Sequence, residues 1–414
     1  MSAMSRLALL AVVFVDLMGQ GLLFPIISEL VMSTKFHFLP LDTPQSTRHL
    51  FYGIVISSFF LAWFLGAVYV AKLSDSIGRK NAMVLCLVGA LAGYAITVVA
   101  LFTSSLWLLI LGRIVSGFTA GNQPIAQAAV IDASCSELDA SRNLGLLVAG
   151  MSAGAVAGPI IAGVLADKAL LGNIASIQLP FYFALLLVGI TLGLILAFYH
   201  DSRKPTAPVQ LRFLDLFRQF VHLKDRPQVV RLCPAYLSFM LVHLSFYIFI
   251  TNYLNSRFQL GLLGTSMAML FMGIAVGISS IFLVKPVLSR WSKPLIIKVS
   301  AFIMGACALI FAFSSQVWLC YLSVFIAYLS FGVAYPALLH LFAQSVNESE
   351  QGWVMGIATA GFTIVATLIS LLGGGAMEIN IRLPFFITAV AAVFVLILIR
   401  LGWRYDAIKK IIDK

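Results

Sequence analysis

Ala71–Lys80, with the sequence AKLSDSIGRK, is a charged, turn-forming stretch between two long apolar segments. Residues 51–70 before it and residues 82–102 after it carry no charged side chain. At a rise of about 1.5 Å per residue, either segment can cross a hydrocarbon layer about 30 Å thick as an α-helix. The stretch is therefore expected to be the short connection between two membrane helices. The positive-inside rule puts it on the cytoplasmic side, since its basic residues are Lys72, Arg79 and Lys80.

The overall composition agrees with a membrane protein. Of the 414 residues, 61% are hydrophobic and only 10% are charged, with a mean hydropathy of +1.01. A soluble globule could not hide that much apolar surface from water. The net charge of +11 does not indicate nucleic-acid binding, because the basic residues gather in loops expected to be cytoplasmic, where they favour anionic lipids. The basic residues expected elsewhere are Lys35, Arg48, Lys168, Arg257 and Arg382 on the outer side and Arg113 within the membrane.

Apolar segments of membrane length predict an all-α protein with twelve transmembrane helices and with both termini in the cytoplasm. The expected helices cover residues 6–31, 50–72, 81–102, 106–132, 141–167, 179–199, 229–255, 263–289, 294–313, 317–345, 351–377 and 383–403.

The chain is expected to contain two related six-helix halves, residues 1–200 and 229–404, followed by a cytoplasmic tail at 405–414. Between them lies a basic linker at 201–228. Its segment 212–220 either forms an amphipathic helix on the inner membrane surface or is plainly solvated. The repeat is visible in residues about 212 positions apart, and the matching pairs are Trp107 with Trp318 and Pro124 with Pro336.

Four stretches of the first half carry glycine, proline and charged residues at characteristic spacings. They are Asp16, Gly19, Gly21 and Pro25; Leu73, Asp75, Gly78, Arg79 and Lys80; Arg113, Gly117 and Gly121; and Gly150, Gly154, Gly158, Pro159 and Gly163. Together they resemble the signature motifs of the major facilitator superfamily, and more narrowly of its twelve-helix drug:proton antiporters, which include the tetracycline efflux proteins. The resemblance implies two six-helix halves with a binding site near the midplane between them. The departures from the family pattern are Ser28, Ala71, Ser76 and Ala162.

The opening stretch is expected to act as a cytoplasmic gate. Asp75 can accept charge-assisted hydrogen bonds and hold neighbouring helix ends in one conformation until those bonds break. Gly78 gives the backbone freedom that a tight turn needs, and the cations of this gate are Arg79 and Lys80.

Asp16 and Arg113 are the candidates for proton coupling, a role that for Arg113 is implied by the family resemblance. A charged side chain inside a membrane helix costs about 2.5 to 3.5 kcal/mol on insertion scales, so it needs a partner, water or a function. An ionised carboxylate at the position of Asp16 is expensive, which suits a group that takes up and releases protons. A direct pair between the two is not assured, because Arg113 is expected roughly 9 Å from the midplane at ~1.5 Å per residue.

The glycine stripe of the fifth expected helix is interpreted as an interdomain hinge. Gly150, Gly154, Gly158 and Gly163 recur at intervals that allow close backbone approach, and Pro159 removes a helix hydrogen bond. A close, bendable contact between the halves would prevent leaks. The same pattern could also serve plain helix packing.

Several other polar residues of the membrane segments are candidates for lining the substrate cavity, although a residue of this kind is individually more often a satisfied interhelical hydrogen bond than a ligand contact. They are Gln20, Asn122, Gln123, Gln127, Asn252 and Tyr335. The five cysteines show no CxxC spacing and no neighbouring histidine cluster, so neither a disulfide nor a metal site is expected.

The sequence therefore predicts a proton-coupled transporter of the bacterial inner membrane that exports a small amphipathic organic solute by alternating access. No enzyme motif, no phosphate-binding loop and no cofactor requirement is apparent, and the proton gradient is the expected energy source. A monomer is favoured. The rival interpretations are a proton-coupled importer or exporter of a metabolite or siderophore, and a transporter-like sensor or scaffold.

Overall fold

The computed structural model describes residues 2–134, 137–201, 221–347 and 350–403. Within these ranges the chain is α-helical and contains no strand. The predicted amphipathic segment at 212–220 and the tail at 405–414 lie outside the described residues.

The described residues of the first half form seven long or medium α-helices and one short α-helix. They are α1 (Ala3–Met32), α2 (Gln45–Ile77), α3 (Arg79–Thr103), α4 (Leu106–Phe118), α5 (Asn122–Asp132), α6 (Glu137–Ala166), α7 (Lys168–Leu171) and α8 (Leu179–Phe198). In the second half, a π-helical segment at Ser279–Leu283 joins α12 to α13. Its helices are α10 (Pro227–Tyr247), α11 (Ile250–Phe258), α12 (Leu262–Ile278), α13 (Val284–Arg290), α14 (Lys293–Phe313), α15 (Val317–Gln344), α16 (Gln351–Ile379) and α17 (Leu383–Gly402).

Eleven helical spans among the described residues are long and apolar enough to cross a membrane. The expected crossing at 106–132 differs, because α4 ends at Phe118 and α5 starts only at Asn122. Pro124 has no N–H to donate to the preceding turn, which makes a break there inexpensive. Its repeat partner Pro336 lies inside the continuous helix α15, so the proline alone does not end the helix.

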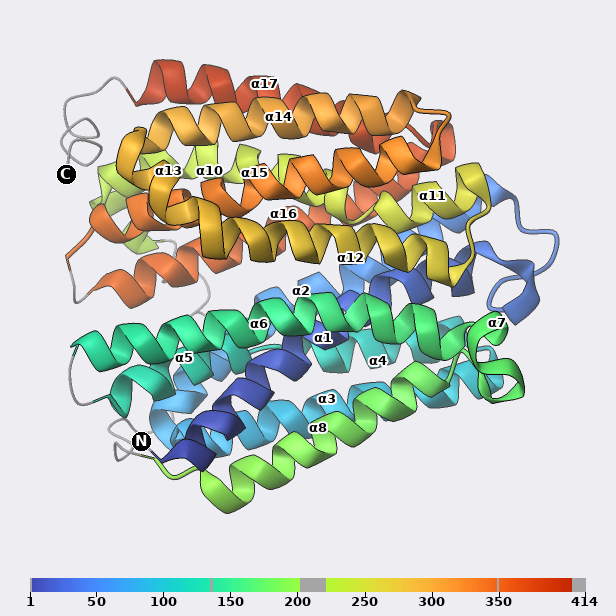
Figure 1. The fold of residues 1–414 in the computed structure, drawn as a ribbon, viewed down its shortest axis with the longest axis horizontal. Coiled ribbons are helices and arrows are strands. Elements are labelled where there is room, and N and C mark those ends of the chain that lie inside the picture. The colour runs from blue at the N-terminus through green and yellow to red at the C-terminus, as the bar shows by residue number, and fades with distance from the viewer. Residues whose placement is uncertain (1, 135–136, 202–220, 348–349, 404–414) are drawn as a thin grey trace.

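The two halves lie side by side along the bundle axis (Figure 1). Helices α1–α8 occupy the lower part of the view and α10–α17 the upper part. Helix α1 begins and α17 ends at the left, which we call the terminal end; the opposite end is the far end. The halves contact each other mainly where α2 packs against α16 and α6 packs against α12.

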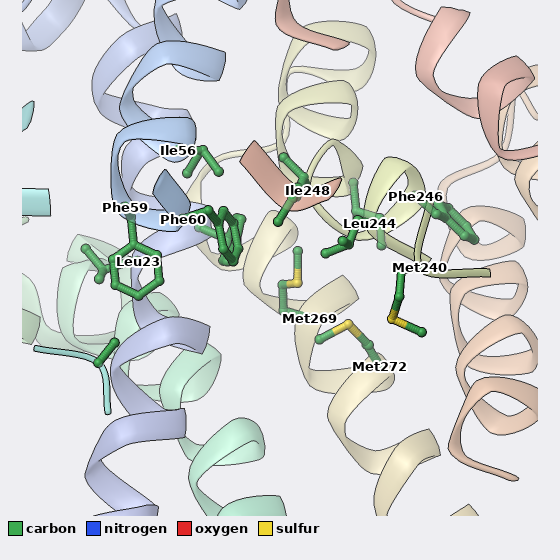
Figure 2. Packing of buried hydrophobic residues seen from close by; sticks show 14 of the residues in the cluster. Leu23, Ile56, Phe59, Phe60, Met240, Leu244, Phe246, Ile248, Met269 and Met272 are labelled. Atoms are coloured by element: carbon green, nitrogen blue, oxygen red, sulfur yellow. The ribbon is translucent and has the colours of Figure 1, made fainter. Parts of the chain in front are cut away.

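The interface between the halves is apolar in its middle. Figure 2 shows the buried residues there, which come from α1 and α2 on one side and from α10 and α12 on the other. They include Leu23, Ile56, Phe59 and Phe60 of the first half and Met240, Leu244, Met269 and Met272 of the second. Methionine adapts its shape to irregular gaps, which suits surfaces that must repack.

The loop at the far end between α1 and α2 is held by one buried cation. Arg48 is only 1% exposed. Its guanidinium donates to the carbonyl oxygens of Val31 at 3.0 Å, Pro40 at 2.9 Å and Thr43 at 3.3 Å. Arg48, expected on the outer side, therefore ties the loop to the end of α1.

Candidate functional site

Asp16 lies in the middle of α1 and faces the break between α4 and α5. Its carboxyl group lies within hydrogen-bonding reach of the side chain of Asn122, the first residue of α5. Asp16 is partly exposed, whereas Asn122 is only 1% exposed. The amide oxygen Oδ1 of Asn122 has no hydrogen-bond partner among the described residues. The broken crossing therefore brings a buried polar group, with one acceptor unused, beside the membrane carboxylate.

Arg113 lies on α4 and is 4% exposed. Within the described residues no ion pair joins it to Asp16 or to another acid, and its Nε atom has no hydrogen-bond acceptor. The guanidinium carbon instead sits 4.2 Å from the ring centroid of Phe59. A cation over an aromatic face gains a favourable electrostatic contact, which is stronger where water is excluded. The two predicted coupling residues are thus separate polar centres in the same half.

Tyr94 of α3 lies between these two centres and was not among the predicted site residues. It is 7% exposed, and the charges of both Asp16 and Arg113 act on its hydroxyl group. Its hydroxyl lies against Gly19 of α1, where a Cβ atom would overlap it. The signal available in the sequence was the single tyrosine of the expected helix 81–102.

The glycine stripe of α6 packs mostly within the first half. A Cβ atom at Gly154 would meet the backbone of Phe14, and one at Gly158 would meet the backbone of Met18, both in α1. Gly150 likewise faces α1, and Pro159 contacts Gly21. Within the stripe only Gly163 reaches the second half, where a Cβ atom added to it would lie 3.0 Å from Ser266 of α12. The expected interdomain contact is therefore chiefly a close α1–α6 contact, because the stripe faces α1.

The predicted gate residues form a compact ionic cluster at the terminal end. Gly78 has a φ of 93°, a backbone conformation that favours glycine and allows α2 to turn directly into α3. Arg79 donates to Asp75 at 2.7 Å and to Asp132 at 3.1 Å. Lys80 donates through its backbone to Asp201 at 2.9 Å and through Nζ to the Leu196 carbonyl at 2.8 Å. These contacts lie within the first half, apart from the one to Asp201, which is the first residue of the linker.

Asp132, at the end of α5, was missed because it is the last residue of a segment assigned to the membrane, 106–132. The Arg79–Asp132 contact has a counterpart in the second half, where Lys293 Nζ donates to Gln344 Oε1 at 2.6 Å. Gln344 occupies the position of Asp132 in the repeat, about 212 residues later. In both halves a side-chain contact therefore joins two helix ends at the terminal end. The Arg79–Asp132 contact is an ion pair, whereas the Lys293–Gln344 contact is a hydrogen bond to a neutral amide.

We expect Asp132→Asn to destabilise the first half more than Asp75→Asn. The carboxylate of Asp132 is 15% exposed and that of Asp75 is 57% exposed. A hydrogen bond to a charged group contributes about 1.5 to 3 kcal/mol when shielded, whereas an exposed ion pair contributes about 0 to 1 kcal/mol. Thermal unfolding of the purified variants in one detergent measures both effects. Equal shifts in melting temperature would contradict this assignment.

Four buried or partly buried hydrogen bonds between described residues join the two halves at the far end. His49 of α2 is bonded to Asn252 of α11 at 3.0 Å, and the Tyr52 hydroxyl donates to the Ile248 carbonyl at 2.5 Å. Asn255 donates to Glu29 of α1 at 3.1 Å, and Thr251 donates to the Phe24 carbonyl at 3.4 Å. We call these four contacts the far-end latch. Asn252, proposed from the sequence as a cavity residue, is fully buried in this latch.

The remaining predicted cavity residues differ in exposure. Gln20, Gln123, Gln127 and Tyr335 are partly exposed, whereas Asn122 is buried beside Asp16. Their assignment to a substrate cavity stays a prediction. Among the residues that the structure describes, no group of three His, Cys, Asp or Glu side chains could hold a metal ion.

Comparison with known proteins decides the family. A family model described as Major Facilitator Superfamily matches residues 9–352, which is most of the chain. The chain belongs to the Major Facilitator Superfamily. The family and the all-α membrane fold predicted from the sequence are thereby confirmed, and the chain is a multi-pass membrane transporter.

Relatives of this facilitator include antibiotic resistance proteins. The class C tetracycline resistance protein of Escherichia coli is 27% identical over 392 residues, which span 93% of this chain and 89% of that protein. The class G tetracycline resistance protein of Vibrio anguillarum is 27% identical over 376 residues, 89% of either chain. Among solved structures, the human organic anion transporter MFSD10 superposes with a TM-score of 0.72 at 19% identity, over 95% of this chain and 98% of that one. The last similarity concerns the fold alone.

Proposed function

We propose that this facilitator exports a small amphipathic organic solute in exchange for protons entering the cell. It acts as a monomer in the bacterial inner membrane, without a cofactor and with both termini in the cytoplasm. The observation that carries the proposal is the partly exposed membrane carboxylate Asp16, which has an amide partner but, among the described residues, no cation in an ion pair with it. The names of the relatives as tetracycline resistance proteins support export of a drug-like solute. They give no support to siderophore transport, to import or to a sensor.

The surroundings of Asp16 can accommodate both forms of its carboxyl group. The ionised form can accept a hydrogen bond from the Asn122 amide, which lies within reach. The protonated form has an O–H to donate, and Asn122 Oδ1 is an acceptor without another partner in the described part of the chain. A proton can therefore be taken up without leaving a buried polar group unsatisfied, which would otherwise cost about 1 to 3 kcal/mol. Arg113 provides a fixed positive charge in the same half.

Proton exchange is linked to transport through the contacts between the halves. In the present conformation the far-end latch is closed. Opening toward the far end requires those four hydrogen bonds to break and the α2–α16 contact to loosen. Asp16 belongs to α1, the helix that also supplies Phe24 and Glu29 to the latch. Protonation of Asp16 therefore biases a helix that takes part in closure.

Transport into everted membrane vesicles tests this function. One proton moving down a pH difference of one unit supplies about 1.4 kcal/mol, enough for about a tenfold solute gradient. We expect tetracycline or a quinolone to accumulate to roughly this extent in acid-loaded vesicles and to leak out when a protonophore is added. Accumulation that survives the protonophore, or solute movement in the same direction as protons, would contradict antiport.

A further inference from the structure

The second half contains a stack of nearly parallel rings beside its contact with α2. His243 of α10 lies over Phe331 of α15, with ring centroids 4.0 Å apart and an interplanar angle of 17°. Tyr247 lies 5.5 Å from His243 at 15°, and Tyr335 lies 5.3 Å from Phe331 at 16°. Phe362 of α16 lies 6.4 Å from His243 at 28°. We call these five residues the ring stack. Three separate helices present their rings in one orientation.

The ring stack contains polar atoms that have no partner among the described residues. His243 is 9% exposed, and its Nδ1 atom has no hydrogen-bond partner among the described residues. The hydroxyl groups of Tyr247 and Tyr335 form no hydrogen bond with any described residue, and both side chains are partly exposed. A buried polar atom without a partner is costly and is expected to have a reason. Unused polar atoms along the edges of parallel rings are what a polar, flat ligand would require.

The stack also lies where the two halves separate. Phe362 contacts Trp63 of α2 at 5.8 Å and 71°, and Phe60 of α2 at 6.1 Å and 74°. Tyr247 contacts Phe24 of α1 at 4.7 Å. Movement of one half against the other changes these edge-on contacts but leaves the His243–Phe331 pair intact, because that pair belongs to the second half alone. The stack is thus exposed or covered by the conformational change.

We propose that the ring stack binds the flat part of the transported solute, and that His243 forms a hydrogen bond with it. The solute class is a planar conjugated ring system bearing a hydroxyl or carbonyl group. An imidazole nitrogen donates or accepts according to its tautomer, so either group can pair with it. Parallel aromatic faces favour flat rings over saturated ones. The inference rests on the proposed function only in calling the ligand the transported solute.

Equilibrium binding to the purified protein in lipid nanodiscs tests the proposal, with empty nanodiscs as the blank. The probes are 9-phenanthrol and its fully saturated perhydro analogue, which share a skeleton and a hydroxyl group but differ in planarity. We expect the wild type to prefer 9-phenanthrol by roughly 3- to 10-fold, the range for aromatic contacts beyond buried area. Calorimetry gives both affinities.

Three variants separate the contributions of the His243 nitrogen and of the Phe331 ring to probe binding. His243→Phe keeps a ring but removes the nitrogen, and is expected to weaken 9-phenanthrol binding by roughly 3- to 10-fold. Phe331→Leu removes the stacking partner. It is expected to bring the ratio of the affinities for 9-phenanthrol and its saturated analogue close to one. Phe311→Leu changes a ring that contacts Phe246 and Tyr253 but has no ring contact with a described member of the ring stack, and it should leave both affinities unchanged. Gel filtration and thermal unfolding identify any variant that fails to fold.

Unchanged affinities in folded His243→Phe and Phe331→Leu, or no preference in the wild type, would overturn the proposal. Binding requires no proton gradient, so this test is independent of export. A protein that binds 9-phenanthrol at the stack but exports nothing would retain the site and contradict the proposed function.

Discussion

Asp16→Asn is expected to abolish proton-driven accumulation while leaving solute binding in place. Asparagine has the shape of aspartate and can keep a hydrogen bond with Asn122, so the local packing of α1 against α5 is preserved. It cannot gain or lose a proton. The variant should therefore bring the solute gradient in energised vesicles from about tenfold per pH unit to about one. Fluorescence or radiolabel uptake into everted vesicles measures the ratio.

A matched control removes a carboxylate that has no place in the mechanism. Asp42→Asn changes an exposed residue of the far-end loop and is expected to leave the accumulation ratio unchanged. Binding of the solute at equilibrium should be similar in Asp16→Asn, Asp42→Asn and the wild type. If Asp16→Asn still builds a proton-driven gradient, another group carries the proton.

The sequence was sufficient to predict the fold because membrane helices are encoded locally. Residues 82–102, for example, carry no charge. In lipid, the backbone N–H and C=O groups of such a segment must hydrogen-bond to one another, which makes the segment a helix. The break between α4 and α5 was not predicted, because the composition of 106–132 is that of a continuous crossing. The backbone departs from helix at 119–121 through turns such as Ala120 N–H to the Gly117 carbonyl. That choice depends on neighbouring helices rather than on local propensity.

The partners of the charged residues were harder to predict than the residues themselves. Asp16 and Arg113 were identified because a charge in a membrane helix is rare and expensive. That Asp16 meets Asn122 while Arg113 lies over Phe59 depends on how helices rotate about their axes. Hydropathy carries little information on such rotation. The far-end latch was missed for the same reason, since only the packed halves bring His49 to Asn252.

The glycine stripe of α6 shows that spacing alone predicts a close helix contact but not the identity of the contacting helix. Its spacing predicts close approach of another helix, and the structure contains that approach. The spacing does not say which helix approaches, and α1 takes the place that was assigned to the second half. Two glycines that do bring the halves together are Gly53 and Gly374, which stand outside any recognised motif.

Gly53→Ala is expected to push the equilibrium away from the conformation that is closed at the far end. A Cβ atom at Gly53 would overlap the backbone carbonyl of Ser370 and lie 3.1 Å from the Cα of Gly374. In the other direction, a Cβ at Gly374 would lie 2.8 Å from the His49 carbonyl. Because the obstructing atoms are backbone atoms, α2 and α16 have to move apart. Overpacking of this kind costs about 1 to 3 kcal/mol, a shift of roughly 5- to 150-fold in the equilibrium.

Labelling of a latch residue measures that shift. Thr251→Cys, placed in a chain whose five native cysteines are replaced by alanine, puts a thiol at a position that is fully buried when the latch is closed. A membrane-impermeant maleimide added from the far side should label this thiol faster when Gly53→Ala is also present. Gly375→Ala is the matched control, since a Cβ there meets nothing within 4 Å. Labelling rates that are the same in both variants would mean that the Gly53–Gly374 contact does not govern closure. A faster labelling rate in Gly53→Ala alone would show that the contact between Gly53 and Gly374, two glycines outside any recognised motif, stabilises the conformation that is closed at the far end.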